Sequence, residues 1–295
     1  MQGKADVSFT TRFAPSPTGP LHLGHAYSAL LAHDMARANH GTFLLRIEDI
    51  DPQRSKPQWH AQLIDDLAWL GIRWDAAPMR QSDRMPAYRA ALDQLWALGL
   101  LYPCTCTRRD IDLALGAPQE GAPHHGPDGP VYPGICRTRP RSGPRPTDQH
   151  LRLDMAAALS GISSTTFLET GPDHAGTITR TAQDYAARIG DIVLARRDFG
   201  TSYHLSVVVD DAAQSITHVT RGADLFEATA IHVLLQRLLG LPHPVYHHHR
   251  LIRDSQGKRL AKRDDARALA KFRAEGATPQ TIRRMVGLDP VPPSA

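Results

Sequence analysis

RFAPSPTGPLHLGH, residues 12–25, decides the fold of this chain. A β-type segment leads into Arg12, a Pro/Gly-rich turn follows, and an apolar helical run opens at His22. The first N–H groups of a helix lack backbone partners and the helix dipole is positive there, so this strand–turn–helix unit can hold an anion. Gly24 removes a side chain where backbone and ligand would crowd. His22 and His25 can donate hydrogen bonds to a phosphate.

The surrounding pattern predicts an α/β fold. We expect a strand at residues 7–12, a helix at 22–39 and a second strand at 42–48, which together form a β-α-β unit. Apolar residues at helical spacing, the last of them Leu98, predict two further helices that pack on the core.

The later part of the chain continues the pattern. Residues 206–210 and 214–221 are predicted strands, and a capping box at Asp224 and Glu227 predicts the start of a helix. Pro279 at a first helical position predicts a last helix over residues 278–287.

Composition narrows the class of protein. A chain of 295 residues with 41% hydrophobic content can bury a substantial core, and it has no apolar run of 18 residues, so we expect no membrane partner. The first residues lack the apolar core of a signal peptide, which favours a cytoplasmic location. Three cysteines argue against a disulfide framework and favour free thiols or a metal site. The net charge of +4 is compatible with a polyanionic partner.

A second motif lies far downstream, in GKRLAKR at residues 257–263. Taken with HLGH at residues 22–25, it resembles the paired signatures of class I aminoacyl-tRNA synthetases. The opening motif is similar to the glutamyl branch of that family, and the likeness extends over most of residues 7–265. Within the branch, the chain is most similar to the shortened group of glutamyl-Q tRNA(Asp) synthetases. Further matching segments are RIEDID at 46–51, Tyr203, VVVDD at 207–211 and RGAD at 221–224.

The resemblance implies a two-step reaction, in which L-glutamate is activated with ATP to glutamyl-adenylate and is then transferred to a tRNA. It assigns ATP binding to His22, Gly24, His25 and Lys262, with Mg²⁺ as the expected counter-ion of the phosphates. His22, His25 and Lys262 are the expected catalytic residues. The basic motif departs from the family pattern, because Arg259 replaces a lysine and Ala261 replaces a serine.

The resemblance also implies a glutamate pocket. Arg12 and Arg221 are the expected partners of the substrate carboxylates, since guanidinium offers a bidentate fork. Glu48 is the expected partner of the ammonium group and Tyr203 a wall or hydroxyl donor. The pocket is completed by Phe13, Ala14, Pro15 and Ser16, which match the glutamyl and not the glutaminyl pattern. The alternative is that Arg12 and the Arg46/Glu48 pair form purely structural ion pairs.

A zinc site is expected around Cys104, Cys106 and Cys136. Zinc takes four tetrahedral ligands, usually cysteine or histidine. Tyr132 is the fourth ligand that the resemblance implies, and His124 or His125 is the chemical alternative. Three unlinked thiols are the remaining possibility. Gly and Pro fill 14 of the 31 positions from 116 to 146, and such a loop gains stability from a metal.

The predicted architecture is a Rossmann-type class I synthetase catalytic domain with an inserted, zinc-binding, loop-rich module and a short helical C-terminal stub. The catalytic domain is expected at residues 1–101 and 186–264, the acceptor-binding-like module at 102–185 and the stub at 265–295. The basic motif then belongs to the second half of the catalytic domain. No anticodon-binding domain is expected.

The glutamyl-Q likeness implies that the acceptor is the queuosine base at the wobble position of tRNA(Asp), bound by a monomer. Two alternatives are a minimal glutamyl-tRNA synthetase that charges a 3′ end and a non-catalytic paralogue that binds tRNA or amino acid. A nucleotidyltransferase of the same superfamily is disfavoured by the retained pocket residues. The candidate tRNA-contacting residues are Arg108, Arg109, Arg137, Arg139, Arg141 and Arg145.

Two other segments receive structural interpretations. Asp210 and Asp211 could form a catalytic carboxylate pair, but a buried strand followed by a turn is the preferred interpretation. The run His247–His249 is interpreted as a strand end or solvated segment without a metal role.

Overall fold

The computed structural model describes residues 8–115, 125–253 and 267–288. A parallel sheet forms its first half, with β1 (Thr10–Phe13) paired to β2 (Thr42–Ile47) in the register Thr10↔Thr42 to Phe13↔Leu45. The short β3 (Met79–Arg80) pairs with the other edge of β2. Helix α1 (Leu23–Ala38) connects β1 to β2 and buries its alanine-rich face, so the predicted β-α-β unit is confirmed.

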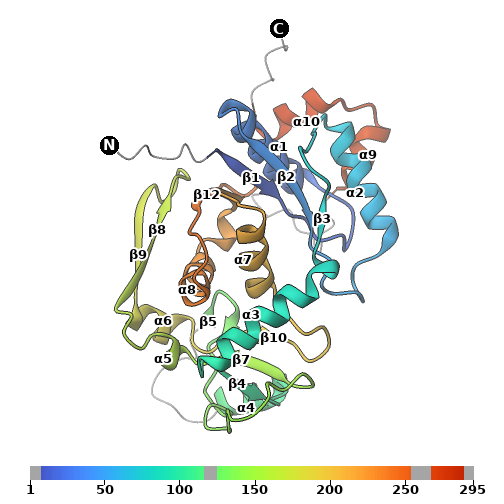
Figure 1. The fold of residues 1–295 in the computed structure, drawn as a ribbon. Coiled ribbons are helices and arrows are strands. Elements are labelled where there is room, and N and C mark those ends of the chain that lie inside the picture. The colour runs from blue at the N-terminus through green and yellow to red at the C-terminus, as the bar shows by residue number, and fades with distance from the viewer. Residues whose placement is uncertain (1–7, 116–124, 254–266, 289–295) are drawn as a thin grey trace.

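The second half of the sheet comes from the distant end of the sequence, where β11 (His218–Gly222) and β12 (Val245–His249) pair in parallel. The N–H of Thr217 donates to the carbonyl of Thr10 at 3.0 Å, and the N–H of Thr10 donates to the Thr217 hydroxyl at 2.8 Å. These contacts set β11 against the free edge of β1. β12 continues through a single parallel pairing into the long hairpin of β8 (Ser164–Glu169) and β9 (Gly176–Thr181), at the left of Figure 1.

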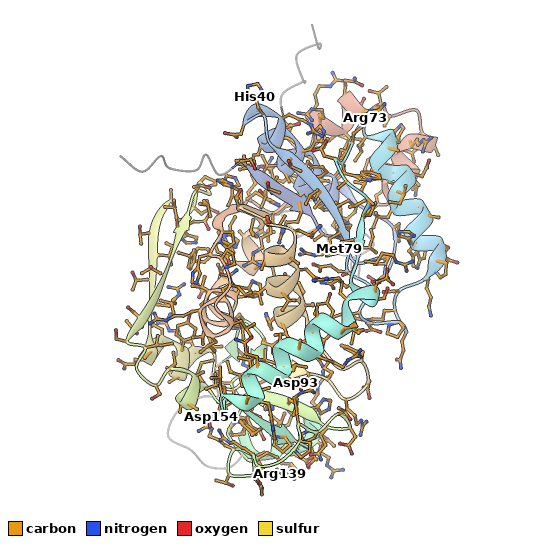
Figure 2. The ribbon with its side chains drawn as sticks, viewed as in Figure 1. His40, Arg73, Met79, Asp93, Arg139 and Asp154 are labelled. Atoms are coloured by element: carbon orange, nitrogen blue, oxygen red, sulfur yellow. The ribbon has the colours of Figure 1, made fainter. Side chains whose placement is uncertain are left out.

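A smaller antiparallel sheet lies at the opposite end of the molecule (Figure 1). Its strand order is β10 (Val193–Ala195), β7 (His150–Leu153) and β4 (Leu101–Cys104). Figure 2 shows Arg139 at this lower end, far from His40 and Arg73 at the upper end. Around the sheet lie the hairpin of β5 (His125–Gly126) and β6 (Gly129–Pro130) and the helices α4 (Arg108–Leu115), α5 (Met155–Ala158) and α6 (Ala182–Arg188).

Three helices form one hydrophobic cluster with residues of the smaller sheet such as Leu101 and Leu153, while β1, β2 and α1 belong to a separate cluster. α3 (Met85–Ala97), α7 (Tyr203–Ala213) and α8 (Thr229–Leu239) pack together through residues such as Tyr88, Leu205 and Leu234. The helices α2 (Pro57–Trp69), α9 (Leu269–Ala274) and α10 (Pro279–Met285) lie beside α1 and β3. The 3-10 turn η1 (Gln81–Arg84) directly precedes α3, and the 3-10 turn η2 (Ala223–Leu225) follows β11 and contacts β12. The predicted last helix is confirmed, since Thr278 caps α10 and Pro279 is its first residue.

The predicted strand at residues 206–210 is wrong, because these residues belong to helix α7. The segment is rich in valine, which favours a strand, but it is buried on nearly every side and so carries no helical periodicity. The Ser202 side chain accepts a hydrogen bond from the N–H of Leu205 and starts the helix. Packing against α3 and α8 then outweighs local propensity.

Three smaller expectations are also corrected. α8 begins at Thr229 without a side-chain cap, and Glu227 instead pairs with Arg180, so the capping box does not form. The run His247–His249 is the end of strand β12, so its interpretation as a strand end is confirmed, whereas the alternative of a solvated segment is wrong because His248 and His249 are buried. Leu98 is 57% exposed just past the end of α3 and does not join the core. In the described part of the chain, no helix is both long and apolar enough to span a membrane.

Candidate active site

A cleft of about 490 Å³ opens where β1, the start of α1, β11 and α7 meet. All eight residues predicted for the glutamate pocket line it, from the first strand (Arg12) to the eleventh (Arg221), and so do His22, Gly24 and His25. The cleft therefore gathers the two predicted subsites in one cavity. Lys262, the last predicted ATP-binding residue, lies outside the described residues, as do Arg259 and Ala261.

The histidines of the HLGH motif build the N-terminus of α1. Nδ1 of His22 accepts from the N–H of Gly24 at 3.1 Å, and Nδ1 of His25 accepts from the N–H of His22 at 3.2 Å. Because both Nδ1 atoms accept, the proton of each neutral ring lies on Nε2. Capping the helix and donating to a phosphate are thus compatible roles. A Cβ on Gly24 would lie only 3.0 Å from the His22 ring, which explains the glycine.

Asp211 links β1 and β2, the two longer strands of the first half-sheet. Its carboxylate pairs with Arg12 of β1 at 2.9 Å and with Arg46 of β2 at 2.6 Å, and Arg46 also pairs with Glu48 at 3.2 Å. Burial favours protonation of Asp211, but the two arginines outweigh it and lower its pKa to about 2. For Glu48 the effect of burial is larger than that of the arginines, so its pKa is raised although Arg46 and Arg12 act to lower it. The structural ion pairs foreseen as an alternative therefore form, and Arg12 and Glu48 nevertheless face the cleft.

Helix geometry explains why Asp210 plays a different role from its neighbour. Successive helical residues point about 100° apart, so Asp210 faces α3 while Asp211 faces β1. Asp210 accepts from the Tyr88 hydroxyl at 2.6 Å and pairs with Arg84 at 3.2 Å. It is fully buried and does not line the cleft. The two carboxylates therefore do not form a catalytic pair.

Arg221 is buried and held by neutral partners. Its Nε donates to Nε2 of His248 at 3.1 Å, Nη1 to Nδ1 of His232 at 2.8 Å, and Nη2 to the hydroxyl of Thr229 at 2.7 Å. A guanidinium has five N–H groups, so two remain for a ligand in the cleft. Within the described ranges, no carboxylate lies in ion-pair distance of Arg221. Its charge is therefore available to an anionic ligand in the cleft.

Tyr203 closes the cleft beside Arg221. Burial raises the pKa of its hydroxyl, which therefore stays protonated and can donate a hydrogen bond. Beside α1, Ser28 Oγ and Nε2 of His249 lie 2.6 Å apart, and both residues line the cleft.

The three cysteines come together near the small sheet. Sγ of Cys104, Cys106 and Cys136 lie within 4.8 Å of one another. The Tyr132 hydroxyl lies 3.5 Å from Sγ of Cys104 and 3.2 Å from Sγ of Cys106. His125 stands outside this group, and His124 lies outside the described residues.

The surroundings of this cysteine cluster act on its members in opposite directions, since burial raises the pKa of Cys106 to about 11 and also raises the pKa of the Tyr132 hydroxyl. The Arg152 guanidinium lies 3.8 Å from the centre of the Tyr132 ring and its Nε is 3.4 Å from Sγ of Cys104. Burial raises the pKa of the Cys136 thiol, but the Thr105 N–H and the Tyr132 hydroxyl outweigh it and lower that pKa to about 7. Three thiols and a phenol in one buried group form a donor set that suits a tetrahedral metal.

A second cleft, of about 540 Å³, lies next to the cysteine cluster. Among its lining residues are Arg108, His150, Arg196 and Arg197. Of the arginines expected to contact tRNA, three are paired inside the protein, namely Arg137 with Asp191, Arg141 with Asp154 and Arg145 with Asp93. Arg139 donates to Thr105. Sequence reasoning missed Arg196 and Arg197, which no motif marks.

Comparison with known proteins identifies the family. The sequence model of one protein family, described as the catalytic domain of class I tRNA synthetases (E and Q), matches residues 8–124 and 173–295. A protein named glutamyl-Q tRNA(Asp) synthetase from Rhodobacter capsulatus is 66% identical over 94% of this chain and 99% of its own length. The chain belongs to the glutamyl-Q tRNA(Asp) synthetase family. A second protein of that name, from Symbiobacterium thermophilum, is 41% identical over 92% of this chain and 83% of its own length.

Solved structures agree with this membership. The glutamate tRNA ligase of Elizabethkingia meningosepticum superposes on 95% of the synthetase chain with a TM-score of 0.75 and 28% identity. The chain spans only 60% of the length of that protein. The methionyl-tRNA synthetase of Mycobacterium tuberculosis, at 10% identity and a TM-score of 0.61, shares the fold. The predicted Rossmann-type synthetase fold is thereby confirmed, while the domain boundaries within it stay a prediction.

Replacing Asp211 tests the ion-pair network of the synthetase. Asp211→Asn removes the carboxylate that two buried arginines share, and it should lower the free energy of unfolding by about 3–5 kcal/mol. Because the native pKa of Asp211 is lowered to about 2, the parent should lose this stabilisation as the pH falls from about 4 towards 2. Urea unfolding across this pH range and at pH 7 measures both effects.

The matched control is Asp198→Asn, which removes an exposed carboxylate that pairs with Arg197. It should leave the free energy of unfolding nearly unchanged. Equal stability of the two variants at pH 7 would contradict the role given to Asp211.

Proposed function

We propose that this chain activates L-glutamate with ATP and transfers it to the queuosine base at the wobble position of tRNA(Asp). The observation that carries the first step is the cleft, in which Arg221, with no carboxylate partner in the described structure, lies with Glu48 and Tyr203 near the two histidines of a helix N-terminus. The likeness to proteins named glutamyl-Q tRNA(Asp) synthetase supports the acceptor.

The first step joins two anions, so it depends on positioning and charge neutralisation. A glutamate carboxylate oxygen attacks the α-phosphorus of ATP, and the bond to the bridging oxygen breaks to release pyrophosphate. His22 and His25 bind phosphate oxygens at the start of α1 through Nε2–H. Lys262 and Mg²⁺ are proposed to neutralise the leaving phosphates.

Recognition of glutamate uses both ends of the molecule. Arg221 and Arg12 bind carboxylates, and Glu48 binds the ammonium group. Arg46, fully buried behind them, holds Glu48 at 3.2 Å. Phe13 at the end of β1 and the following Ala14, Pro15 and Ser16 line the cleft.

In the second step, a hydroxyl oxygen of the queuosine cyclopentenediol attacks the carbonyl carbon of glutamyl-adenylate. An ester bond forms, the bond from this carbon to the phosphate oxygen breaks to release AMP, and the hydroxyl proton passes to water. Arg108, Arg196 and Arg197 in the second cleft are proposed to bind tRNA phosphates. A tRNA substrate is compatible with a cytoplasmic location, and we propose that the enzyme acts as a monomer.

We also propose that Cys104, Cys106, Cys136 and Tyr132 hold one Zn²⁺. The ion would cross-link two segments of a loop-rich module that has a small core. Arg152 would balance the negative charge of three thiolates and a phenolate.

Arg221→Ala should reduce glutamate-dependent ATP–pyrophosphate exchange about 30-fold or more, because loss of a buried charge partner costs ~2–5 kcal/mol. The parent should activate glutamate in preference to glutamine and aspartate. The exchange assay, run with tRNA(Asp) present, measures both. Exchange at the parent rate in Arg221→Ala, or equal exchange with glutamine, would contradict the pocket.

Elemental analysis of protein purified without added metal should find about one zinc per chain. Tyr132→Phe should lose zinc to a chelator faster than the parent, while His125→Gln should retain it as the parent does. A parent with no zinc and three freely titrating thiols would refute the site. If His125→Gln loses zinc and Tyr132→Phe retains it, the fourth zinc ligand is His125 and not Tyr132.

The acceptor is tested with ATP, labelled glutamate and two forms of tRNA(Asp), one with queuosine and one with guanosine at the wobble position. Label should enter only the queuosine form and map to the anticodon. Label at the 3′ end of the guanosine form or of tRNA(Glu) would favour a minimal glutamyl-tRNA synthetase. Absence of both exchange and label would favour a non-catalytic paralogue.

A further inference from the structure

Two buried histidines that lie outside the predicted site hold the guanidinium of Arg221. His232 lies on α8 and is 2% exposed, and His248 lies on β12 and is also 2% exposed. Neither lines the cleft. Each contacts Arg221 through a ring nitrogen, so they fix the guanidinium from two different elements.

The direction of these hydrogen bonds determines the tautomers. Arginine only donates, so Nδ1 of His232 must accept and its proton must lie on Nε2. That Nε2 is 3.1 Å from Nδ1 of His204, which must then accept in turn. His204 Nε2 carries the next proton and faces Asp128 at 3.5 Å. The chain of donors therefore runs in one direction, from Arg221 to a carboxylate at the rim of the second cleft.

The second branch follows the same rule. Nε2 of His248 accepts from Arg221, so its proton lies on Nδ1, which is 2.5 Å from Glu169. Glu169 is fully buried and also accepts from the N–H groups of Gly171 and His248. This carboxylate is thereby fixed one imidazole away from the guanidinium.

The neutral form of both rings is essential to this arrangement. Burial lowers the pKa of His232 well below its usual range, and Arg221 and His204 lower it further. Burial also lowers the pKa of His248, against the opposing effect of Glu169. A protonated ring would have no acceptor to offer Arg221 and would repel it.

The arrangement fixes the position of the Arg221 guanidinium without bringing a negative charge into contact with it. A buried arginine is usually fixed by a carboxylate, which also neutralises it. Here the acceptors in direct contact are two imidazoles and a hydroxyl, and the carboxylates stand one or two rings away. The guanidinium is therefore fixed while its charge stays available.

We propose that His232 and His248 are positioning residues that hold Arg221 in place without neutralising it, so that its charge selects a glutamate carboxylate over the amide of glutamine. This inference rests on the proposed function, since it assigns a specificity role within the same pocket. Thr229 is the third member of this neutral frame.

A pair of variants that differ by one charge separates the positioning of Arg221 from the availability of its charge. Both Asn and Asp at position 232 can offer an oxygen near the place of Nδ1, but only Asp neutralises Arg221. His232→Asn should keep the KM for glutamate within about threefold of the parent. His232→Asp should raise that KM about tenfold or more and lower the preference for glutamate over glutamine, while the KM for ATP stays within about twofold.

The assay is ATP–pyrophosphate exchange with glutamate or glutamine in the presence of tRNA(Asp), together with calorimetric glutamate binding. His218→Asn is the control, because His218 is half-buried on β11, stacks on Phe9 and does not line the cleft. It should change neither KM. Thermal melts of all variants show which are folded.

Similar glutamate KM values and selectivity in the Asn and Asp variants would overturn the inference while leaving the proposed function intact. If the His232→Asp substitution prevents folding, His248→Gln and His248→Glu repeat the comparison from the second branch. A parent that neither binds nor activates glutamate would overturn the proposed function and this inference with it.

Discussion

The carboxylate of Asp211, shared by Arg12 and Arg46, is the contact on which the active cleft depends. It joins β1, β2 and α7, which are far apart in the sequence, and it is buried, so its removal would leave two guanidiniums without a counter-charge. Arg46 also forms an ion pair with Glu48 and thereby fixes the position of that carboxylate. Two arginines and two carboxylates then balance one another, and the charge of Arg221 is left for a ligand.

A similar buried carboxylate, Asp191, lies among the elements of the smaller sheet. Asp191 is buried and accepts from the Tyr102 hydroxyl at 2.6 Å, from Arg137 and from the N–H of Met155. Asp210 likewise accepts from a tyrosine hydroxyl. Each carboxylate gathers donors from separate segments, so the polar interior fixes the relative positions of elements that apolar packing alone would allow to shift. Because the donors are numerous, the cost of burying each charge is largely offset.

The sequence allowed us to predict the residues that line the cleft, but not the buried residues that hold Arg221 from behind. RFAPSPTGPLHLGH combines a strand end, a turn and a helix start in one short stretch, so both the β-α-β unit and the lining of the cleft followed from it. Helix α7 was missed because an all-round buried helix rich in valine looks like a strand. His232 and His248 were missed because a single buried histidine in a helix or strand leaves no pattern. Their role depends on which nitrogen carries the proton, and that is decided by tertiary contacts.

The meeting of β1 with β11 has a consequence for folding. Thr10 and Thr217 are bonded across most of the sequence, so the cleft between these strands exists only after the segments in between have folded. A partly folded chain lacks the binding surface, and glutamate or ATP can bind only the complete native state. Such ligands stabilise that state by mass action. Once the ligand concentration exceeds the Kd, the free energy of unfolding rises with the logarithm of the ratio of concentration to Kd. The substrate supply of the cell thus becomes one of the determinants of how long each molecule stays folded.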